Sequence, residues 1–293
     1  MKIFGTGLSG LLGTRIVELL QATHAFSDNS RANGVDITDS EQIRKAINSS
    51  DAEVVLHLAA YTNVKAAELE RDLGEQSESW KINVIGTENV ARACKEAGKK
   101  LIFTSSDMVF DGENTPEGGY TEEAKPHPLS WYAKTKYEGE LRVQALTTPW
   151  IIIRPAYPYR ARFEKNDFVR LFMQKLSQGE QLTVLTDRII TPVFIDDLAP
   201  ALDALLMQNA EGIYHTVGST QLSIFEAAEQ IAECFNYDKK LIGQTTRAEF
   251  LVGRPPEPFN SALNNAKIKR LGVEMRTFRE GLEEIKKQQA TVN

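Results

Sequence analysis

Short apolar runs alternate with longer amphipathic segments through the first half of the chain. The apolar runs predict strands at residues 2–4, 25–27, 53–58, 100–104 and 150–154. Apolar positions at helical spacing predict helices between them, at residues 11–22, 40–48, 77–97 and 130–146. Strands that alternate with helices, without hairpin turns, require right-handed crossovers and form a parallel sheet. Because the runs at 54–56 and 151–153 are apolar at every position, helices should cover both faces of this sheet. The pattern predicts an α/β fold with a doubly wound parallel sheet.

The pattern changes after residue 155. Helices are predicted at residues 167–177, 197–207, 225–235 and 278–287, with a strand at 212–217. Residues 253–258 contain three prolines and are predicted to form a loop, because proline lacks the backbone donor that a helix needs. We interpret residues 1–155 as one domain, to which the chain returns near 193–217. Residues 156–293 are interpreted as mainly a smaller, discontinuous C-terminal lobe.

Composition and charge narrow the classes of function. Of the 293 residues, 42% are hydrophobic and 25% charged, which is the balance of an ordinary globular protein. The formal net charge is −6 and the basic residues are scattered, so we expect no nucleic-acid partner. We also expect no membrane segment and no signal peptide, and hence a cytoplasmic protein. Cys94 and Cys234 lack Cys or His neighbours at metal-ligand spacing, so reduced thiols and no metal are expected.

A glycine cluster directly follows the first predicted strand. Gly7, Gly10 and Gly13 recur at every third position and lead into an amphipathic segment. Glycines at such a turn let the backbone approach a pyrophosphate, whose charge the amide end of the next helix then stabilises. A glycine-rich turn without a ligand is the alternative, and the placement between strand and helix weakens it. The cluster predicts that the first domain binds a dinucleotide.

Two charged residues after the second strand bear on the choice of cofactor. Asp28 follows Gly7 by ~20 residues, which is the spacing at which a carboxylate meets the adenosine ribose of NAD. Arg31 follows three positions later and would instead pair with the 2′-phosphate of NADP. NADPH and NADH therefore both stay open, as does the interpretation that these are two charges on a solvated loop.

A tyrosine, a lysine and a serine form a candidate catalytic set. Tyr132 and Lys136 are four positions apart in a predicted helix, so they share one face. The ammonium group should lower the pKa of the phenol, which could then protonate the alkoxide formed when hydride reaches a carbonyl. Ser106 follows a strand at the edge where parallel sheets bind ligands, and could donate to the same oxygen. The alternatives are a surface helix with an exposed lysine, and a serine that caps a turn.

Several motifs together resemble the extended short-chain dehydrogenase/reductase family, and within it the dTDP-4-dehydrorhamnose reductases. They are Gly7-x-x-Gly10-x-x-Gly13, Leu58-Ala59-Ala60, Asn83-Val84-x-Gly86-Thr87-x-Asn89, Ser106-Asp107-x-Val109-Phe110-Asp111-Gly112 and Tyr132-x-x-x-Lys136. The likeness extends over essentially the whole chain. It implies a Rossmann domain, a C-terminal substrate-binding lobe, NADPH or NADH as cofactor, and reduction of the keto group of a nucleotide-linked sugar. A place in dTDP-rhamnose biosynthesis and a homodimer are also implied.

The resemblance also implies roles for single residues. Ser106, Tyr132 and Lys136 would be catalytic, and Asn83 would support the lysine. Together with the glycine and charge patterns, it gives these cofactor contacts: Gly7, Ser9, Gly10, Leu11, Leu12, Gly13, Asp28, Arg31, Asp36, Ile37, Leu58, Ala59, Ala60, Asn83, Tyr132 and Lys136. The implied substrate contacts are Thr62, Val64, Ser106, Asp107, Tyr157 and Arg254.

The sequence departs from the family pattern at three of these places. Ser106 replaces a usual threonine, Met108 a usual tyrosine, and Tyr157 a usual tryptophan beside the hexose. Related dehydratases carry an Asp-Glu pair after the hydroxyl residue, and Met108 after Asp107 argues against dehydration.

Two other functions stay open beside keto reduction. A sugar-nucleotide epimerase would use the same fold, and so would a non-catalytic regulatory subunit of methionine adenosyltransferase. The second half of the chain also contains Arg160, Arg162 and Arg170. These arginines could bind a diphosphate, or they could lie on the surface without a ligand.

Overall fold

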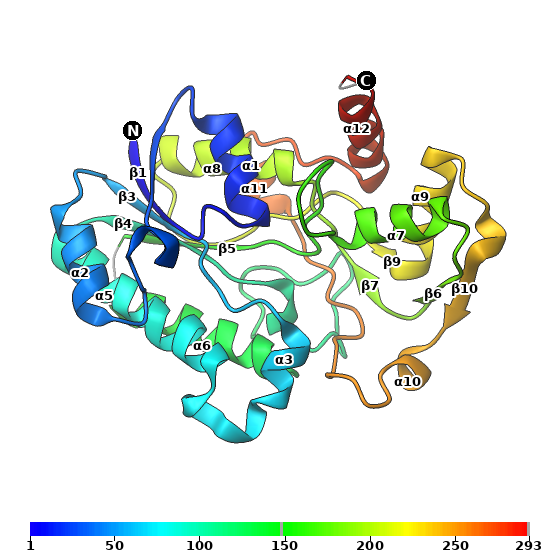
Figure 1. Ribbon diagram of the computed structural model, residues 1–293, viewed down its shortest axis with the longest axis horizontal. Coiled ribbons are helices and arrows are strands. Elements are labelled where there is room, and N and C mark those ends of the chain that lie inside the picture. The colour runs from blue at the N-terminus through cyan, green and yellow to red at the C-terminus, as the bar shows by residue number, and fades with distance from the viewer. Residues whose placement is uncertain (147–148, 292–293) are drawn as a thin grey trace.

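A parallel sheet of six strands, in the order β2-β1-β3-β4-β5-β8, forms the centre of the protein (Figure 1). The computed structural model describes residues 1–146 and 149–291. The strands are β1 (Lys2–Thr6), β2 (Ala25–Asp28), β3 (Val54–His57), β4 (Lys100–Thr104), β5 (Trp150–Arg154) and β8 (Gly212–His215). Each neighbouring pair is parallel. The predicted doubly wound α/β fold is confirmed, and β8 is the strand predicted near residues 212–217.

Helices cover both faces of this sheet, as Figure 1 shows. On one face lie α2 (Ser40–Ser49), α5 (Thr87–Ala97) and α6 (Trp131–Leu146), and on the other α1 (Leu11–Leu20), α8 (Leu198–Met207) and the short α11 (Ala266–Lys269). Successive residues of β4 point to opposite faces: Ile102 packs in the core under α1 and α8, whereas Leu101 and Phe103 pack in the core under the other helices. Both faces being buried explains why the central strands are apolar at successive positions.

The remaining elements pack together beside the sheet around a core of their own, and we call this part the second lobe (Figure 1). They are α7 (Phe168–Ser177), β6 (Leu182–Leu185), β7 (Ile189–Ile190), β9 (Leu222–Ser223), α9 (Ile224–Phe235), β10 (Ile242–Thr245), α10 (Arg247–Phe250) and α12 (Phe278–Ala290). β6 pairs with β10 in parallel and β7 with β9 antiparallel. Helices α9 and α12 both begin with a capping box, at Ser223 and Thr277.

The observed helices and strands differ from those predicted from the sequence mainly in short segments. The helix predicted over residues 77–97 is divided into α4 (Glu78–Trp80), a π-helix (Lys81–Gly86) and α5. One extra residue in a turn shifts the phase of a helix without removing its apolar positions, so periodicity does not reveal it. The prediction also missed α3 (Val64–Leu69), α10, α11 and the strands of the second lobe, which are too short to show a period.

Two further observations concern particular segments. Residues 253–258 contain no helix or strand, as their prolines predicted. Within residues 1–146 and 149–291, no helix is both long and apolar enough to span a bilayer.

Candidate active site

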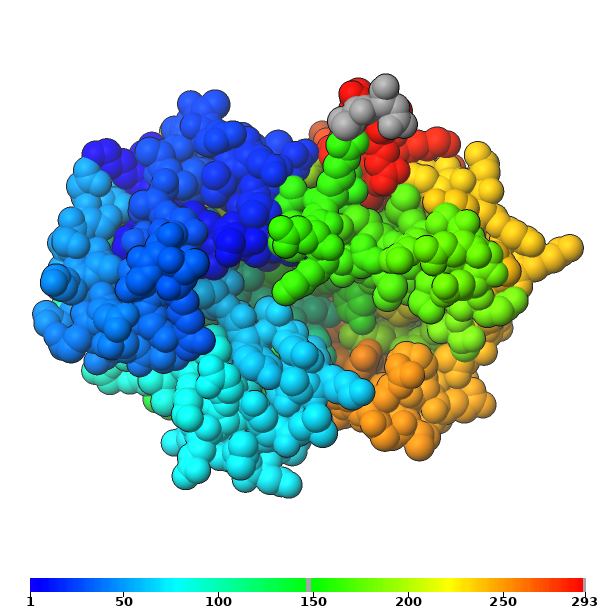
Figure 2. Space-filling model, in the orientation of Figure 1, coloured from blue at the N-terminus to red at the C-terminus, as the bar shows by residue number. Residues whose placement is uncertain are grey.

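A cavity of about 590 Å³ lies at the carboxyl ends of the central strands. Its wall includes Gly7 after β1, Leu58 after β3, Thr104 at the end of β4, and Tyr157 after β5. Figure 2 shows the surface hollowed between the blue and cyan N-terminal half and the green and orange second lobe. The chain goes from β1 to β2 on one side and then crosses to β3 on the other, so strand order reverses here. Open α/β sheets bind their ligands at such a reversal.

The glycine loop between β1 and α1 forms one wall of the cavity. Gly7 has a φ of 70°, and a Cβ there would lie 2.5 Å from the backbone nitrogen of Ala59. A Cβ on Gly13 would lie 2.5 Å from the Cα of Leu8. Gly10, the residue before α1, provides no side chain to cap the helix amides. This cradle of close backbone and an uncapped helix end fits the pyrophosphate of a dinucleotide.

The two residues predicted to select the cofactor lie in different places. Arg31 lines the cavity, where its Nε donates to Asp36 over 2.8 Å. Asp28 does not line it; the Asp28 carboxylate is exposed and accepts a hydrogen bond from the Asn33 amide over 3.1 Å. Asp36 and Ile37 both line this end of the cavity. This end of the cavity therefore carries an ion pair, in which the guanidinium of Arg31 is the cation and the carboxylate of Asp36 the anion.

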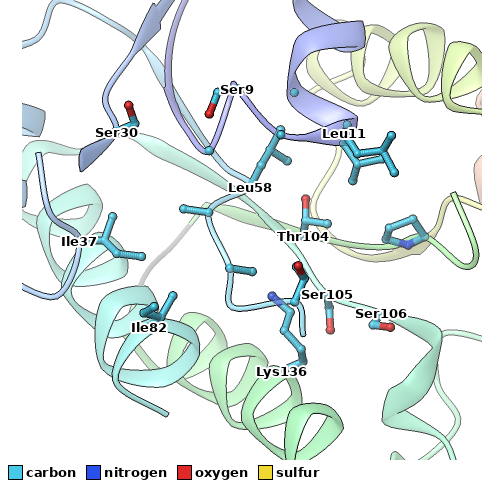
Figure 3. A pocket seen from close by; sticks show the side chains of 18 of the residues that line it. Ser9, Leu11, Ser30, Ile37, Leu58, Ile82, Thr104, Ser105, Ser106 and Lys136 are labelled. Carbon is cyan, nitrogen blue, oxygen red and sulfur yellow. The ribbon is translucent and has the colours of Figure 1, made fainter. Parts of the chain in front are cut away.

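The candidate catalytic residues meet in the same cavity. Ser106 follows β4, while Tyr132 and Lys136 stand in the first turns of α6, and all three side chains are buried and line the cavity. In Figure 3, Lys136 extends from α6 toward the end of β4, close to Ser105. The Lys136 ammonium also lies 4.4 Å from the ring centroid of Phe103. A phenol, an ammonium group and a hydroxyl are thus available to one ligand.

Burial sets the protonation of Tyr132. It raises the pKa of the phenol to about 12; the charge of Asp107 adds to the increase, and hydrogen bonding from Ser106 opposes it. The predicted lowering of this pKa by Lys136 is wrong, because desolvation of the phenolate outweighs other influences. Tyr132 therefore keeps its proton at neutral pH.

Burial also acts on Lys136, and lowers its pKa to about 7 while the nearby Glu140 opposes the change. The turn of α6 that carries Lys136 is held by polar contacts of Asn83, which lies in the π-helix. The Asn83 amide donates to the Thr135 hydroxyl over 2.9 Å, and its oxygen accepts from the Tyr61 backbone over 2.8 Å. Asn83 does not line the cavity, but it ties the π-helix to α6 next to the lysine.

The end of β4 carries polar groups that suit a ligand. The Ser106 hydroxyl donates to Asp107 over 3.2 Å and accepts from the Met108 backbone, so it caps a short 3₁₀ turn while lining the cavity. The hydroxyls of Thr104 and Ser105 are buried in the cavity wall, and neither has a hydrogen-bond partner in the described part of the chain. Buried hydroxyls without partners are costly, which fits a ligand that supplies the missing hydrogen bonds.

Most of the other sequence-predicted contacts also line the cavity: Ser9, Gly10, Leu11, Leu12, Leu58, Ala59, Ala60, Thr62, Asp107 and Tyr157. Val64 packs instead with Trp80 and Trp131, and Arg254 stacks 3.8 Å above the ring of Phe250. None of the three arginines considered for a diphosphate lines the cavity, and each makes contacts within the protein: Arg160 to Thr14 and the Leu11 carbonyl, Arg162 to the Gln288 carbonyl, and Arg170 to Asp167.

Some lining residues were not identified from the sequence: Asn29, Ser30, Val35, Ile82, Thr104, Ser105, Pro155 and Pro158. Several directly neighbour a residue that was identified, such as Ser30 beside Arg31 and Ser105 beside Ser106. Their position at a strand end could have identified them as lining residues, since ligands contact whole turns at such ends.

Comparisons with known proteins show which family the chain resembles. A family model described as RmlD substrate binding domain matches residues 1–291. The solved structure of dTDP-4-dehydrorhamnose reductase from Bacillus anthracis, in complex with NADP, is 30% identical, with a TM-score of 0.88 and coverage of 98% of this chain and 99% of that one. The dTDP-4-dehydrorhamnose reductase of Aggregatibacter actinomycetemcomitans is 29% identical, over 97% of this chain and 98% of the relative. Methionine adenosyltransferase 2 subunit beta of Xenopus laevis is 28% identical, over 95% of this chain and 85% of the relative. The resemblance seen in the sequence motifs is confirmed, and the chain belongs to the RmlD substrate binding domain family.

Proposed function

We propose that the protein reduces the keto group of a nucleotide-linked sugar, with NADPH or NADH as the hydride donor. The observation that carries this proposal is the presence of Ser106, Tyr132 and Lys136 in the cavity that the glycine loop also lines. Membership of the family supports it, as does the similarity to a dTDP-4-dehydrorhamnose reductase in complex with NADP. The uncapped amide end of α1 and the unpartnered hydroxyls of Thr104 and Ser105 suit the cofactor and a polar substrate.

Tyr132 and Ser106 would act on the carbonyl oxygen of the substrate, and Lys136 on the cofactor. A bound nicotinamide supplies the hydride that reaches the carbonyl carbon. Tyr132, protonated at neutral pH because its pKa is about 12, donates its proton to the oxygen, since an alkoxide is a stronger base than a phenolate. The Ser106 hydroxyl, whose single hydrogen is donated to Asp107 in the structure, would turn to donate to the same oxygen, and Lys136 would hold the ribose next to the nicotinamide.

We infer that NADPH is preferred over NADH. The guanidinium of Arg31 lines the cavity, whereas the carboxylate of Asp28 lies outside it. A cation at this end attracts the 2′-phosphate that only NADPH carries.

The second lobe is proposed to bind the sugar nucleotide, with residues 156–293 as its main part. Thr62, Asp107 and Tyr157 line the cavity on this side and are the proposed substrate contacts. Val64 and Arg254, implied by the family resemblance, stay predictions for a complex with substrate.

The direct test is a screen of the purified protein against dTDP- and UDP-linked 4-keto-6-deoxy sugars with each reduced cofactor, following the loss of nicotinamide absorbance. We expect oxidation of NADPH with at least one sugar nucleotide, and faster turnover than with NADH. No oxidation with any member of the panel would contradict the proposal.

The same screen separates the alternatives. An epimerase would convert its sugar without added reductant. A regulatory subunit would bind NADP(H) without turnover, and the similarity to methionine adenosyltransferase 2 subunit beta is the observation in its favour. The complete set of Ser106, Tyr132 and Lys136 favours turnover. A homodimer stays a prediction from the family, and light scattering of the purified protein measures it.

A further inference from the structure

Arg188 is a buried arginine of the second lobe that lies beside the cavity and outside the catalytic set. It stands between β6 and β7 and is 1% exposed. Its Nε donates to the Tyr157 hydroxyl over 2.8 Å, and its Nη1 donates to the Pro258 carbonyl over 2.5 Å. The Glu257 carboxylate lies 3.2 Å from the same Nε. Because a buried guanidinium is costly unless it is paired and hydrogen-bonded, these contacts fix its place between three separate segments of the chain.

The hydrogen bond between Arg188 and Tyr157 has only one possible direction. A guanidinium has donors and no acceptor, so the phenol oxygen must accept. The hydroxyl hydrogen of Tyr157 is then left for another acceptor. Within residues 1–146 and 149–291 this hydroxyl makes no other hydrogen bond. Burial raises the pKa of Tyr157 to about 12, so the hydrogen stays on the oxygen at neutral pH.

The backbone and ring of Tyr157 are also constrained. Its φ is 41°, in the left-handed region that a residue other than glycine rarely adopts. Its ring lines the cavity together with Ser106 and Tyr132, and packs edge-on against Phe168 with 5.4 Å between centroids. Such a conformation persists only where neighbouring groups hold it. The position of this phenol is therefore set by the second lobe.

We propose that Arg188 is a positioning residue that makes the Tyr157 hydroxyl a hydrogen-bond donor to a sugar oxygen of the substrate. This inference rests on the proposed function, because a nucleotide-linked sugar supplies oxygen acceptors on this side of the cavity. The two carboxylates that act electrostatically on Tyr157 already have partners: Glu257 contacts Arg188, and Asp107 accepts from Ser261 over 2.8 Å. Within residues 1–146 and 149–291 neither carboxylate is hydrogen-bonded to the Tyr157 hydroxyl, so its hydrogen is available to the ligand.

Four variants test the proposal. Tyr157→Phe keeps the ring and removes the hydroxyl. Arg188→Met removes the donor, whereas Arg188→Gln can place an amide N–H at the position of Nε, since both nitrogens follow Cδ. Arg170→Met is the matched control, because Arg170 is another buried arginine of the second lobe, paired with Asp167 over 2.8 Å and absent from the cavity wall.

We expect the KM for the sugar nucleotide to rise about 3- to 10-fold in Tyr157→Phe, as the loss of one neutral hydrogen bond implies. Arg188→Met should give a similar rise, and Arg188→Gln should recover part of it. kcat and the affinity for NADPH should change little in all three. The Tyr157→Phe/Arg188→Met double variant should have the KM of Tyr157→Phe alone, because both changes remove the same contact. Arg170→Met should unfold at a lower temperature and keep the wild-type KM.

An unchanged KM in Tyr157→Phe overturns the inference, and so do additive effects in the double variant. If Arg188→Met does not fold, Tyr157→Phe and Arg188→Gln still decide the matter. Calorimetric binding of a dTDP-linked hexose in the presence of NADP⁺ separates this inference from the proposed function. A wild-type protein that binds the hexose nucleotide but oxidises no reduced cofactor with any 4-keto sugar nucleotide of the panel contradicts the proposed function, and weaker binding by Tyr157→Phe then still supports the role of Arg188. A wild-type protein that binds no sugar nucleotide overturns both.

Discussion

Tyr132 and Lys136 are both buried, and their pKa values move in the directions that burial dictates. The phenol reaches a pKa of about 12 and the ammonium group a pKa of about 7. These values suit the reduction of a carbonyl, because the phenol arrives with its proton and gives it only to a stronger base. They also make the charge of Lys136 sensitive to pH near neutrality.

The low pKa of Lys136 predicts how stability changes with pH. The native lysine loses its proton near pH 7, whereas the unfolded chain keeps it until about pH 10.5. Between these values the unfolded state binds more protons, so this group makes the free energy of unfolding rise with pH, by at most ~1.4 kcal/mol per pH unit. Lys136→Met lacks this contribution. The free energy of unfolding of the wild type minus that of the variant should therefore increase from about pH 7 to about pH 9 in urea titrations.

Lys134→Met is the control for this experiment, because Lys134 is exposed on the same helix. The difference in the free energy of unfolding between the wild type and Lys134→Met should stay nearly constant with pH. A constant difference for Lys136→Met as well would show that the buried lysine keeps an ordinary pKa.

The placement of Arg31 predicts cofactor discrimination. Arg31→Gln should raise the KM for NADPH about tenfold, as expected for the loss of a charge-assisted hydrogen bond to phosphate, and should leave the KM for NADH nearly unchanged. Asp28→Asn should have little effect on either cofactor, since Asp28 lies outside the cavity. Steady-state kinetics with both cofactors measure these values, and an equal loss for NADPH and NADH in Arg31→Gln would contradict the assignment.

At the scale of secondary structure elements, the loop between β1 and α1 determines whether a dinucleotide fits. The backbone of Gly7 touches the backbone of Ala59 after β3, so the two strand ends form one continuous wall. No side chain caps the first amides of α1. The loop thus combines close backbone approach with free N–H groups, which is what a pyrophosphate requires.

Gly7→Ala tests this wall, with Gly98→Ala as a matched control. Both glycines have positive φ, 70° and 65°, but a Cβ on Gly98 would meet nothing within 4 Å. Gly98→Ala should cost about 1 kcal/mol of stability through backbone strain alone. Gly7→Ala should cost more and weaken NADPH binding, because the backbone of Ala59 must move. Urea unfolding and fluorescence titration with NADPH measure both effects; equal costs and unchanged NADPH affinity would argue against the crowded loop.

At the scale of the whole molecule, the cavity depends on two parts that are predictable to different degrees. The sheet could be predicted because its strands and helices repeat a simple alternation, and because Gly7, Ser106 and Tyr132 follow or face strand ends in a fixed way. The second lobe could not be predicted in the same detail, because strands such as β7 contain only two residues.

The contacts of Arg188 show why part of the site lay beyond sequence reasoning. Its partners Tyr157 and Pro258 are 31 and 70 positions away along the chain, and no local pattern connects them. The pKa of Tyr132 could not be predicted either, since four-residue spacing reveals a neighbouring lysine but not the extent of burial. The positions of residues along an element are encoded locally, whereas desolvation and long-range contacts arise only when the chain is folded.

The most direct test of the account is the activity of Tyr132→Phe. With the sugar nucleotide that the wild type reduces, the variant should lose turnover of NADPH, because the carbonyl oxygen loses its assigned proton donor, while its affinity for NADPH stays within a few-fold of the wild type. A Tyr132→Phe protein that still oxidises NADPH at a rate close to that of the wild type would contradict the proposed chemistry.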